Sequence, residues 1–179
     1  MRKLKTEELQ RLSIEEFKIK KKIPLVLVLD NVRSMANVGS TFRTGDAFRI
    51  EKILLCGITA QPPHREINKT ALGATDSVDW AYTENTTEAI SELKKAGYTI
   101  AVVEQAEGST ALQSFMPDPA QKIAVVFGNE VFGVSDEVIE LADVVLEIPQ
   151  YGTKHSLNIS VTVGIVTWDI FSKMNPPVD

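Results

Sequence analysis

Three polar segments of this chain carry the side chains that could do chemistry, and each follows a short apolar run. The segments are NVGSTFRT (37–44), FGNEVFGVS (127–135) and IPQYGTKHSLNIS (148–160). Their candidate residues are Asn37, Arg43, Glu130, Ser156 and Asn158. Charged groups hold or move charge, and the amides and the hydroxyl orient a substrate through hydrogen bonds. Loops that follow the strands of one parallel sheet gather at one edge, so we expect a single ligand site.

Known nucleotide and hydrolase motifs are not matched by these segments. Gly128 and Gly133 have the spacing of a phosphate loop, but Val134 stands where that motif needs a lysine, which excludes a nucleoside triphosphatase. A G-x-G-x-x-G fingerprint and a G-x-S-x-G nucleophile turn are both missing from the sequence.

Composition indicates a soluble globular chain of 179 residues, with 44% apolar and 24% charged residues. Cys56 is the single cysteine, and only His64 and His155 join it as potential metal ligands, so we expect no disulfide and no metal site. The longest apolar run, 23–29, is too short to cross a bilayer. No secretory signal is recognised, and we expect a cytoplasmic protein without membrane contact.

Charge is distributed unevenly along the chain, whose formal net charge is −5. Residues 1–22 hold eight Lys and Arg against four Glu, and the rest is strongly acidic. We predict a basic helical arm over 1–22 and one domain over 23–174, with a possible capping box at Ser13 and Glu16. The arm could contact phosphates, but a solvated amphipathic helix explains its charge equally simply.

The order of elements predicts the fold class. Continuous apolar runs predict buried strands, and helical patterns lie between them. The predicted strands are 25–30, 53–58, 99–104, 122–128 and 143–149, and the predicted helices are 41–50, 65–73, 86–97 and 135–142. This alternation indicates an α/β fold, a parallel sheet with helices on both faces.

Residues 157–171 alternate like a strand at first, but their length favours a helix. A helix that is apolar on most faces needs burial in a core or an interface. In so short a chain we expect an interface, and hence a homodimer.

Taken together, the three segments resemble the motifs of the SpoU/TrmH-type RNA ribose 2′-O-methyltransferases of the SPOUT superfamily. KTALGATDSVDW (69–80) is similar to the region that connects the first two motifs, and the resemblance runs from about residue 24 to about residue 172.

The resemblance implies a C-terminal trefoil knot, S-adenosylmethionine bound in the knot, and a dimer with the site near its interface. The implied cofactor contacts are Val103, Glu104, Gly128, Ile148 and Leu157, and Asn37, Arg43, Glu130, Ser156 and Asn158 match the family's functional polar positions. The short arm and the few residues in 174–179 favour transfer RNA over ribosomal RNA as the partner.

Several roles stay open at this level. Arg43 could assist deprotonation of a ribose hydroxyl, or hold a phosphate and stabilise the alkoxide, since arginine stays protonated. It could also be a surface ion-pair partner of Asp46. Asn37 could cap a helix, Ser156 could cap the final helix, and Asn158 could also be a cap. Glu130 could join the second loop to the first or third. A non-catalytic RNA-binding factor with the same fold, or a small-molecule enzyme, are the alternative functions.

Overall fold

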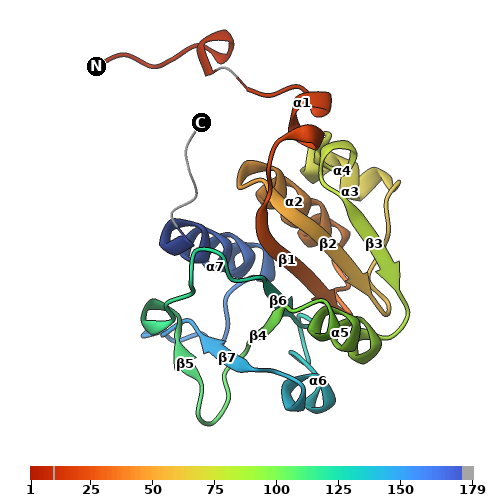
Figure 1. Ribbon diagram of the computed structural model, residues 1–179, viewed down its shortest axis with the longest axis vertical. Helices are drawn as coiled ribbons and strands as arrows, with labels where there is room; N and C mark the ends of the chain where they lie inside the picture. The colour runs from red at the N-terminus through yellow and green to blue at the C-terminus, as the bar shows by residue number, and fades with distance from the viewer. Residues whose placement is uncertain (10, 175–179) are drawn as a thin grey trace.

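Strand β1 (Ile23–Asp30) is buried between two parallel neighbours at the centre of the sheet. The structure is a computed structural model that describes residues 1–9 and 11–174. In the described residues seven parallel strands pair in the order β3-β2-β1-β6-β4-β7-β5 (Figure 1). The other strands are β2 (Ile50–Cys56), β3 (Trp80–Thr83), β4 (Thr99–Val103), β5 (Thr110–Ala111), β6 (Ile123–Phe127) and β7 (Val144–Glu147).

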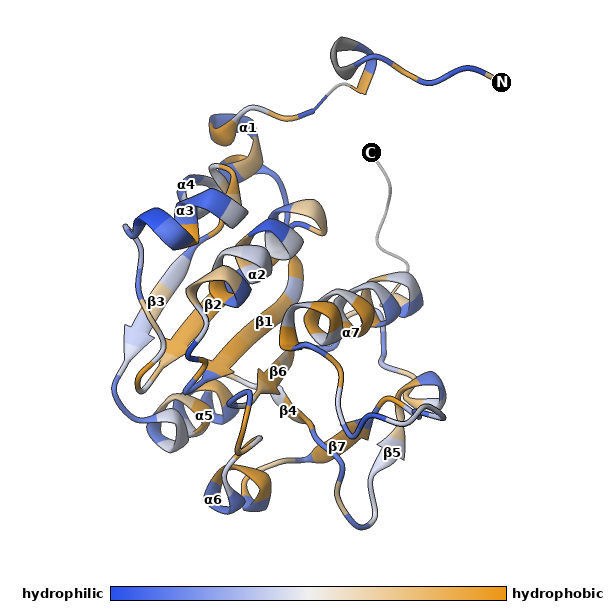
Figure 2. Ribbon diagram, turned by 180° about the vertical axis from the view of Figure 1, so that it is seen from behind, coloured by the Kyte–Doolittle hydropathy of each residue, from blue (hydrophilic) through white to orange (hydrophobic). Residues whose placement is uncertain are grey.

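Helices cover both faces of this sheet, as predicted. They are α1 (Ile14–Ile19), α2 (Met35–Ala47), α3 (Arg65–Ala71), α4 (Ala74–Ser77), α5 (Thr86–Lys95), α6 (Asp136–Glu140) and α7 (Ile159–Met174), with short 3-10 turns at Thr6–Leu9 and Leu112–Ser114. Side chains alternate along β1: Leu25, Leu27 and Leu29 pack with α2, α3 and α7, whereas Val26 and Val28 pack with α5 and α6. Two apolar layers therefore enclose the sheet, whose central strands are mostly hydrophobic (Figure 2).

Several elements differ from the sequence-based expectation. Helix α4 was not predicted, and β2 begins at Ile50, inside the predicted helix 41–50 and three residues before the predicted strand 53–58. Both β3 and β5 went unpredicted, because edge strands of two to four residues leave little apolar pattern. Helix α2 begins at Met35, six residues before the predicted start, because the Ser34 side chain accepts a hydrogen bond from the Asn37 N–H and caps the helix.

The N-terminal arm is attached to the body by its last turn. Ser13 and Glu16 form the expected capping box at the start of α1. Phe17 is 5% exposed and belongs to the core, and the Lys22 ammonium lies over its ring and donates to its carbonyl oxygen. Residues 1–9 lie away from the sheet (Figure 1).

Residues 159–174 form a helix, α7, which confirms the predicted choice of helix over strand. Its inner stripe packs on α2, and Val163, Val166 and Ile170 are fully buried there. Its outer stripe, Val161, Ile165 and Trp168, is 39–56% exposed. No helix within the described ranges is long and apolar enough to cross a membrane. Of the tail used to favour transfer RNA, residues 175–179 lie outside the described part.

Candidate functional site

A cavity of about 740 Å³ opens at the carboxyl ends of β4, β6 and β7. Its walls come from segments far apart in sequence: the end of β4, the loop after β6 and the segment that joins β7 to α7. Eight of the ten predicted site residues line it: Val103, Glu104, Gly128, Glu130, Ile148, Ser156, Leu157 and Asn158. Asn37 and Arg43 do not. The volume is that of an ordinary small-molecule site.

The loop after β6 forms one wall and is tightly folded on itself. Asn129 and Gly133 exchange two backbone hydrogen bonds of 2.9 Å, and the Asn129 side chain accepts from the Val131 and Phe132 N–H groups at 2.8 and 3.1 Å. A Cβ on Gly128 would lie 2.2 Å from the Gly133 carbonyl carbon. Gly128 therefore makes room for the loop's own backbone, a role the sequence did not reveal.

Glu104 joins this loop to the end of β4. Its carboxylate accepts hydrogen bonds from the Val134 N–H at 3.0 Å and from the Gln105 N–H at 2.9 Å. Gly133 has φ +70°, and a Cβ there would lie 2.2 Å from a Glu104 carboxylate oxygen. The contact fixes two walls of the cavity relative to each other.

Glu130 joins the same loop to the start of α2. One carboxylate oxygen accepts from the Arg33 N–H at 2.9 Å; the other accepts from the Ser34 N–H at 2.9 Å and from Asn37 Nδ2 at 3.0 Å. Of the two expected partners, Glu130 thus joins the first loop. Asn37 is 8% exposed and stands in the first turn of α2, where Ser34 rather than Asn37 is the cap.

Electrostatics at Glu130 favour its charged form. Burial on its own raises the pKa of this carboxyl, but the hydrogen bonds from Arg33, Ser34 and Asn37 outweigh burial and leave the pKa below its usual value. A carboxylate whose two oxygens already accept three protein hydrogen bonds is a weak base. Glu130 is therefore suited to holding the loop in place.

The third wall ends at the start of α7, and Asn158 caps that helix. Its side-chain oxygen accepts from the Ser160 N–H at 2.9 Å, and its backbone carbonyl accepts from the Val161 and Thr162 N–H groups at 3.0 Å. The prediction that Ser156 caps the final helix was wrong, because the helix begins three residues later, at Ile159. Ser156 is exposed and lines the cavity.

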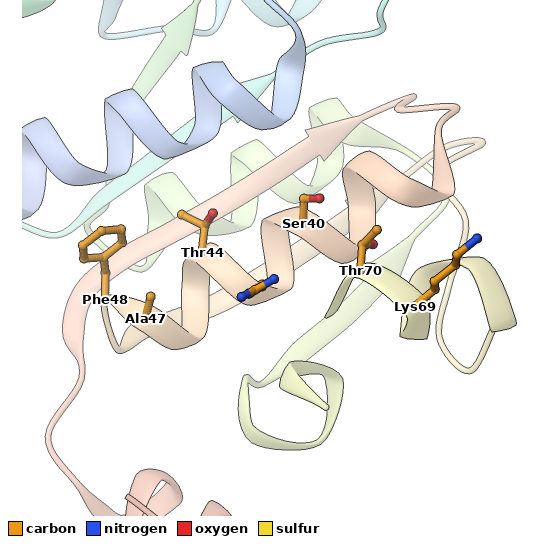
Figure 3. A pocket seen from close by; sticks show the side chains of 7 residues that line it. Ser40, Thr44, Ala47, Phe48, Lys69 and Thr70 are labelled. Carbon is orange, nitrogen blue, oxygen red and sulfur yellow. The ribbon is translucent and has the colours of Figure 1, made fainter. Parts of the chain in front are cut away.

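Arg43 lies in a second pocket, of about 450 Å³, between α2 and α3. Figure 3 shows Ser40 and Thr44 on α2, Phe48 directly after that helix, and Lys69 and Thr70 on α3 around this pocket. Arg43 is exposed, and Asp46, its suggested ion-pair partner, instead accepts from the Ser77 hydroxyl. Residue 43 follows the helix start by eight positions, or about 12 Å along the axis, which carries it away from the strand ends.

Gly39 allows the close packing of α2 and α3 that shapes this second pocket. A Cβ there would lie 2.1 Å from Thr70 Oγ1 and 2.2 Å from the Ile67 carbonyl oxygen. The Thr70 hydroxyl donates to the Ala36 carbonyl at 3.0 Å across the two helices. Lys69 and Arg43 consequently share one pocket with three hydroxyl side chains.

Charge differs sharply between the two pockets. The described residues that line the large cavity include four carboxylates, Glu104, Glu130, Asp136 and Glu147, and neither lysine nor arginine. The smaller pocket holds Arg43 and Lys69 and has no acidic lining residue within the described chain. The first environment suits a cationic ligand and the second an anionic one.

Two contributors to the site were missed in the sequence. Asn129 organises the second loop and also donates to the Asn31 carbonyl at 2.8 Å, and Gln105 donates to the His155 carbonyl at 2.8 Å. The Asn-x-x-x-Gly spacing of 129–133 could have indicated the turn. In the described parts of the chain, no group of three or more His, Cys, Asp or Glu residues could hold a metal.

Fold and motifs assign this chain to a family: residues 24–168 match the model of the SpoU rRNA Methylase family, and the chain belongs to that family. Among curated proteins, it is 31% identical over 143 residues to 23S rRNA (guanosine-2′-O-)-methyltransferase RlmB of Neisseria meningitidis, covering 80% of this chain and 56% of that protein. It is 30% identical over 150 residues to tRNA (guanosine(18)-2′-O)-methyltransferase of Borreliella burgdorferi, covering 84% of this chain and 67% of that protein.

Solved structures show the same architecture. The TrmH/SpoU tRNA modifying enzyme of A. aeolicus aligns with a TM-score of 0.80 and 26% identity over 90% of this chain and 81% of its own. The AdoMet-bound rRNA methyltransferase of Sinorhizobium meliloti aligns with a TM-score of 0.76 and 28% identity, over 90% of this chain and 60% of its own. This chain spans 56–64% of the length of several curated relatives that it matches.

Proposed function

We propose that this protein is an S-adenosylmethionine-dependent methyltransferase that methylates a ribose 2′-hydroxyl of RNA. The main observation behind this proposal is the acidic cavity at the strand ends, which has no lysine or arginine among its described lining residues. Phosphate-bearing cofactors would be repelled there, whereas a sulfonium and an ammonium group would be attracted. An AdoMet-bound relative with the same fold supports this choice of cofactor.

Residues of the three walls fit such a cofactor. Val103, Ile148 and Leu157 offer apolar surface for an adenine ring, and the loop 128–134 offers main-chain groups held in one conformation. Glu104 and Glu147 provide negative charge for the cationic part. When bound, the cofactor supplies an activated methyl group. The chain itself has to position the ribose, exclude water and help remove the hydroxyl proton.

Arg43 requires a second copy of the chain in this proposal. It does not line the cavity of its own subunit, so we assign it to the site of the partner in a homodimer. Support comes from the outer stripe of α7, where Val161, Ile165 and Trp168 are exposed beside α2. The Trp168 ring lies 5.8 Å from the Phe48 ring, which borders the Arg43 pocket. An apolar stripe next to this pocket is what a two-fold interface needs.

Within that dimer, Arg43 and Lys69 would hold an RNA phosphate next to the reacting ribose. The guanidinium would stabilise the alkoxide that develops as the hydroxyl proton leaves. Because arginine stays protonated, it suits this role better than the role of a base. Asn158 and Ser156 would orient the ribose, and Glu130 with Asn37 would keep the loop in place. Exposed Ser156 and Asn158 on the cavity wall support the first role.

Finer features of the family are part of the same proposal. Strand β7 lies between β4 and β5, so the segment after β7 leaves beside the connection 104–122, the loop that a trefoil knot would thread. Hydrogen bonds from Gln105 to His155 and from Lys173 to Leu112 link these two segments. We propose that residues 23–174 form the catalytic domain and that residues 1–22 form an arm that contacts RNA. We further propose transfer RNA as the substrate and the cytoplasm as the place of action.

Two measurements test this function. Calorimetry with S-adenosylmethionine should show binding to the purified chain. Incubation with labelled cofactor and RNA from cells lacking the gene, followed by nucleoside mass spectrometry, should show a 2′-O-methylated nucleoside. Cofactor binding without methyl transfer to any RNA fraction would favour the non-catalytic RNA-binding factor. A methyl group found on a base rather than on ribose would contradict the proposed reaction.

A further inference from the structure

Phe132 is a large apolar ring that stands in solvent at the edge of the cofactor cavity. It is 83% exposed, yet it lines the cavity together with Val131, which is 68% exposed. A single exposed apolar side chain needs no explanation, but here two adjacent ones lie at the edge of the cavity that is proposed to hold the cofactor. Neither residue is needed to hold the turn together, because the bonds that do so come from Asn129 and Gly133.

The turn that carries Phe132 is held firmly on both sides. The Asn129 side chain accepts from the Phe132 N–H and donates to the Asn31 carbonyl, so the turn is joined to the end of β1. Its neighbour Glu130 is bonded to the start of α2, and Val134 is bonded to Glu104. The ring is therefore presented from a fixed backbone, which lowers the entropy lost when a ligand packs on it.

Within one subunit the cavity disfavours a phosphate at this edge, because its described charged lining residues are all carboxylates. The part of RNA best suited to contact the Phe132 ring is therefore an uncharged group with a flat apolar face. Unstacked nucleobases are such groups, and RNA-binding proteins stack them on aromatic side chains. Phosphates would lie at the Arg43 and Lys69 pocket instead.

We propose that Phe132 stacks on an unstacked nucleobase of the RNA substrate, at or next to the ribose that is methylated, and so positions that ribose over the cavity. This inference rests on the proposed function and adds a residue that recognises the base. Because every base has an aromatic face, Phe132 contributes positioning without choosing the base by hydrogen bonds.

The test compares Phe132→Ala, Phe132→Leu and Phe132→Trp with the wild-type chain. Methyl transfer is measured on bulk transfer RNA and on ribosomal RNA from cells lacking the gene. Stacking predicts that kcat/KM for RNA falls at least fivefold in Phe132→Ala and Phe132→Leu, mainly through KM, and is kept within about twofold in Phe132→Trp. The cofactor dissociation constant and the oligomeric state should not change in any variant. Met116→Ala, which removes a side chain 74% exposed outside both pockets, is the matched control.

Each other outcome overturns the proposal. Wild-type kinetics in Phe132→Leu would mean that simple apolar contact suffices, and wild-type kinetics in Phe132→Ala would remove any role. Weakened cofactor binding would assign the ring to the cofactor, and loss of the dimer would assign it to a subunit interface. A wild-type chain that methylates neither RNA fraction refutes the proposed function itself, and this inference with it; an active wild type with an unaffected Phe132→Ala refutes this inference alone.

Discussion

The Glu130 carboxylate accepts a hydrogen bond of 3.0 Å from the Asn37 side-chain amide, across 93 residues of sequence. The same carboxylate accepts from two backbone N–H groups just before α2. This contact joins the loop beside the cavity to the helix that carries Arg43, so the two pockets are mechanically connected within one subunit.

Glu130→Gln should therefore destabilise the fold in a pH-dependent way. Hydrogen bonds to a charged group contribute about 1.5–3 kcal/mol, and the exposure of Glu130 reduces the expected loss to about 1 kcal/mol. The folded-state pKa lies below the unfolded value of about 4.3, so the stabilisation is complete above that value and disappears as the pH falls through the folded pKa. Urea unfolding at pH 7 and pH 3 checks this, with Glu107→Gln, an exposed residue, as control. An equal loss at both pH values would rule out the charged carboxylate as the cause.

Mixed dimers should reveal whether Arg43 serves the partner's cavity. Arg43→Ala and Asn158→Ala alone should each reduce methyl transfer at least 100-fold. Co-expression of the two variants should restore about a quarter of wild-type activity, because half of the dimers are mixed and each has one intact site. No recovery in isolated mixed dimers would place Arg43 in its own subunit's site. If Arg43→Ala methylates RNA at an unchanged rate, it has no role in catalysis.

Alanine variants of Asn158 and Ser156 should differ in their effect on stability but should both lower activity. Asn158→Ala removes the side-chain oxygen that caps α7 and should cost about 1 kcal/mol, whereas Ser156→Ala should leave thermal unfolding unchanged. Both variants should slow methyl transfer. Asn158→Asp keeps the capping oxygen and should recover stability without recovering full activity. Equal unfolding temperatures for Asn158→Ala and the wild type would contradict the capping role.

Gly39→Ala should damage the Arg43 pocket by forcing α2 and α3 apart. Its Cβ would meet Thr70 Oγ1 and the Ile67 carbonyl at about 2 Å, so we expect a loss of about 1–3 kcal/mol. Gly152→Ala is the control, since nothing lies within 4 Å of its added Cβ. Thermal unfolding and RNA binding are the measurements. A stable Gly39→Ala chain with normal RNA binding would mean that the helices separate without consequence.

The basic arm should contribute a salt-dependent part of RNA affinity. Phe17 is part of the core, so deletion of 1–22 would confuse stability with binding. Replacement of the exposed Lys3, Lys5, Arg11 and Lys21 by Gln avoids this. If the arm contacts RNA, the slope of log K against log salt becomes shallower by about 0.7–0.9 for each lost phosphate contact. Filter binding of transfer RNA at several salt concentrations measures this slope. An unchanged slope would mean that the arm has only a structural role.

Sequence patterns predicted the layered sheet because five strands are continuous apolar runs, such as 25–30 and 122–128. They also placed Glu130, Ser156 and Asn158 at one edge, since segments that follow parallel strands must meet there, whereas Val103, Glu104, Gly128, Ile148 and Leu157 were implied by the family resemblance. The separation of Arg43 from that cavity was not predictable, because it depends on how far α2 carries the side chain from the strand end. The cap of α7 was misplaced at Ser156, because serine and asparagine two residues apart are both good caps and only the helix start distinguishes them.

Strand β1 pairs with β6, which follows it by more than ninety residues in the sequence. Strand β7 lies between β4 and β5 in the sheet. During synthesis, one edge of β1 therefore stays unpaired until the residues of β6 have left the ribosome. Pairing between strands so far apart in sequence slows folding, and intermediates with unpaired strand edges are prone to aggregate. Residues 146–162 supply the last wall of the cavity, so this wall can form only after the strands that carry the other two walls have been made.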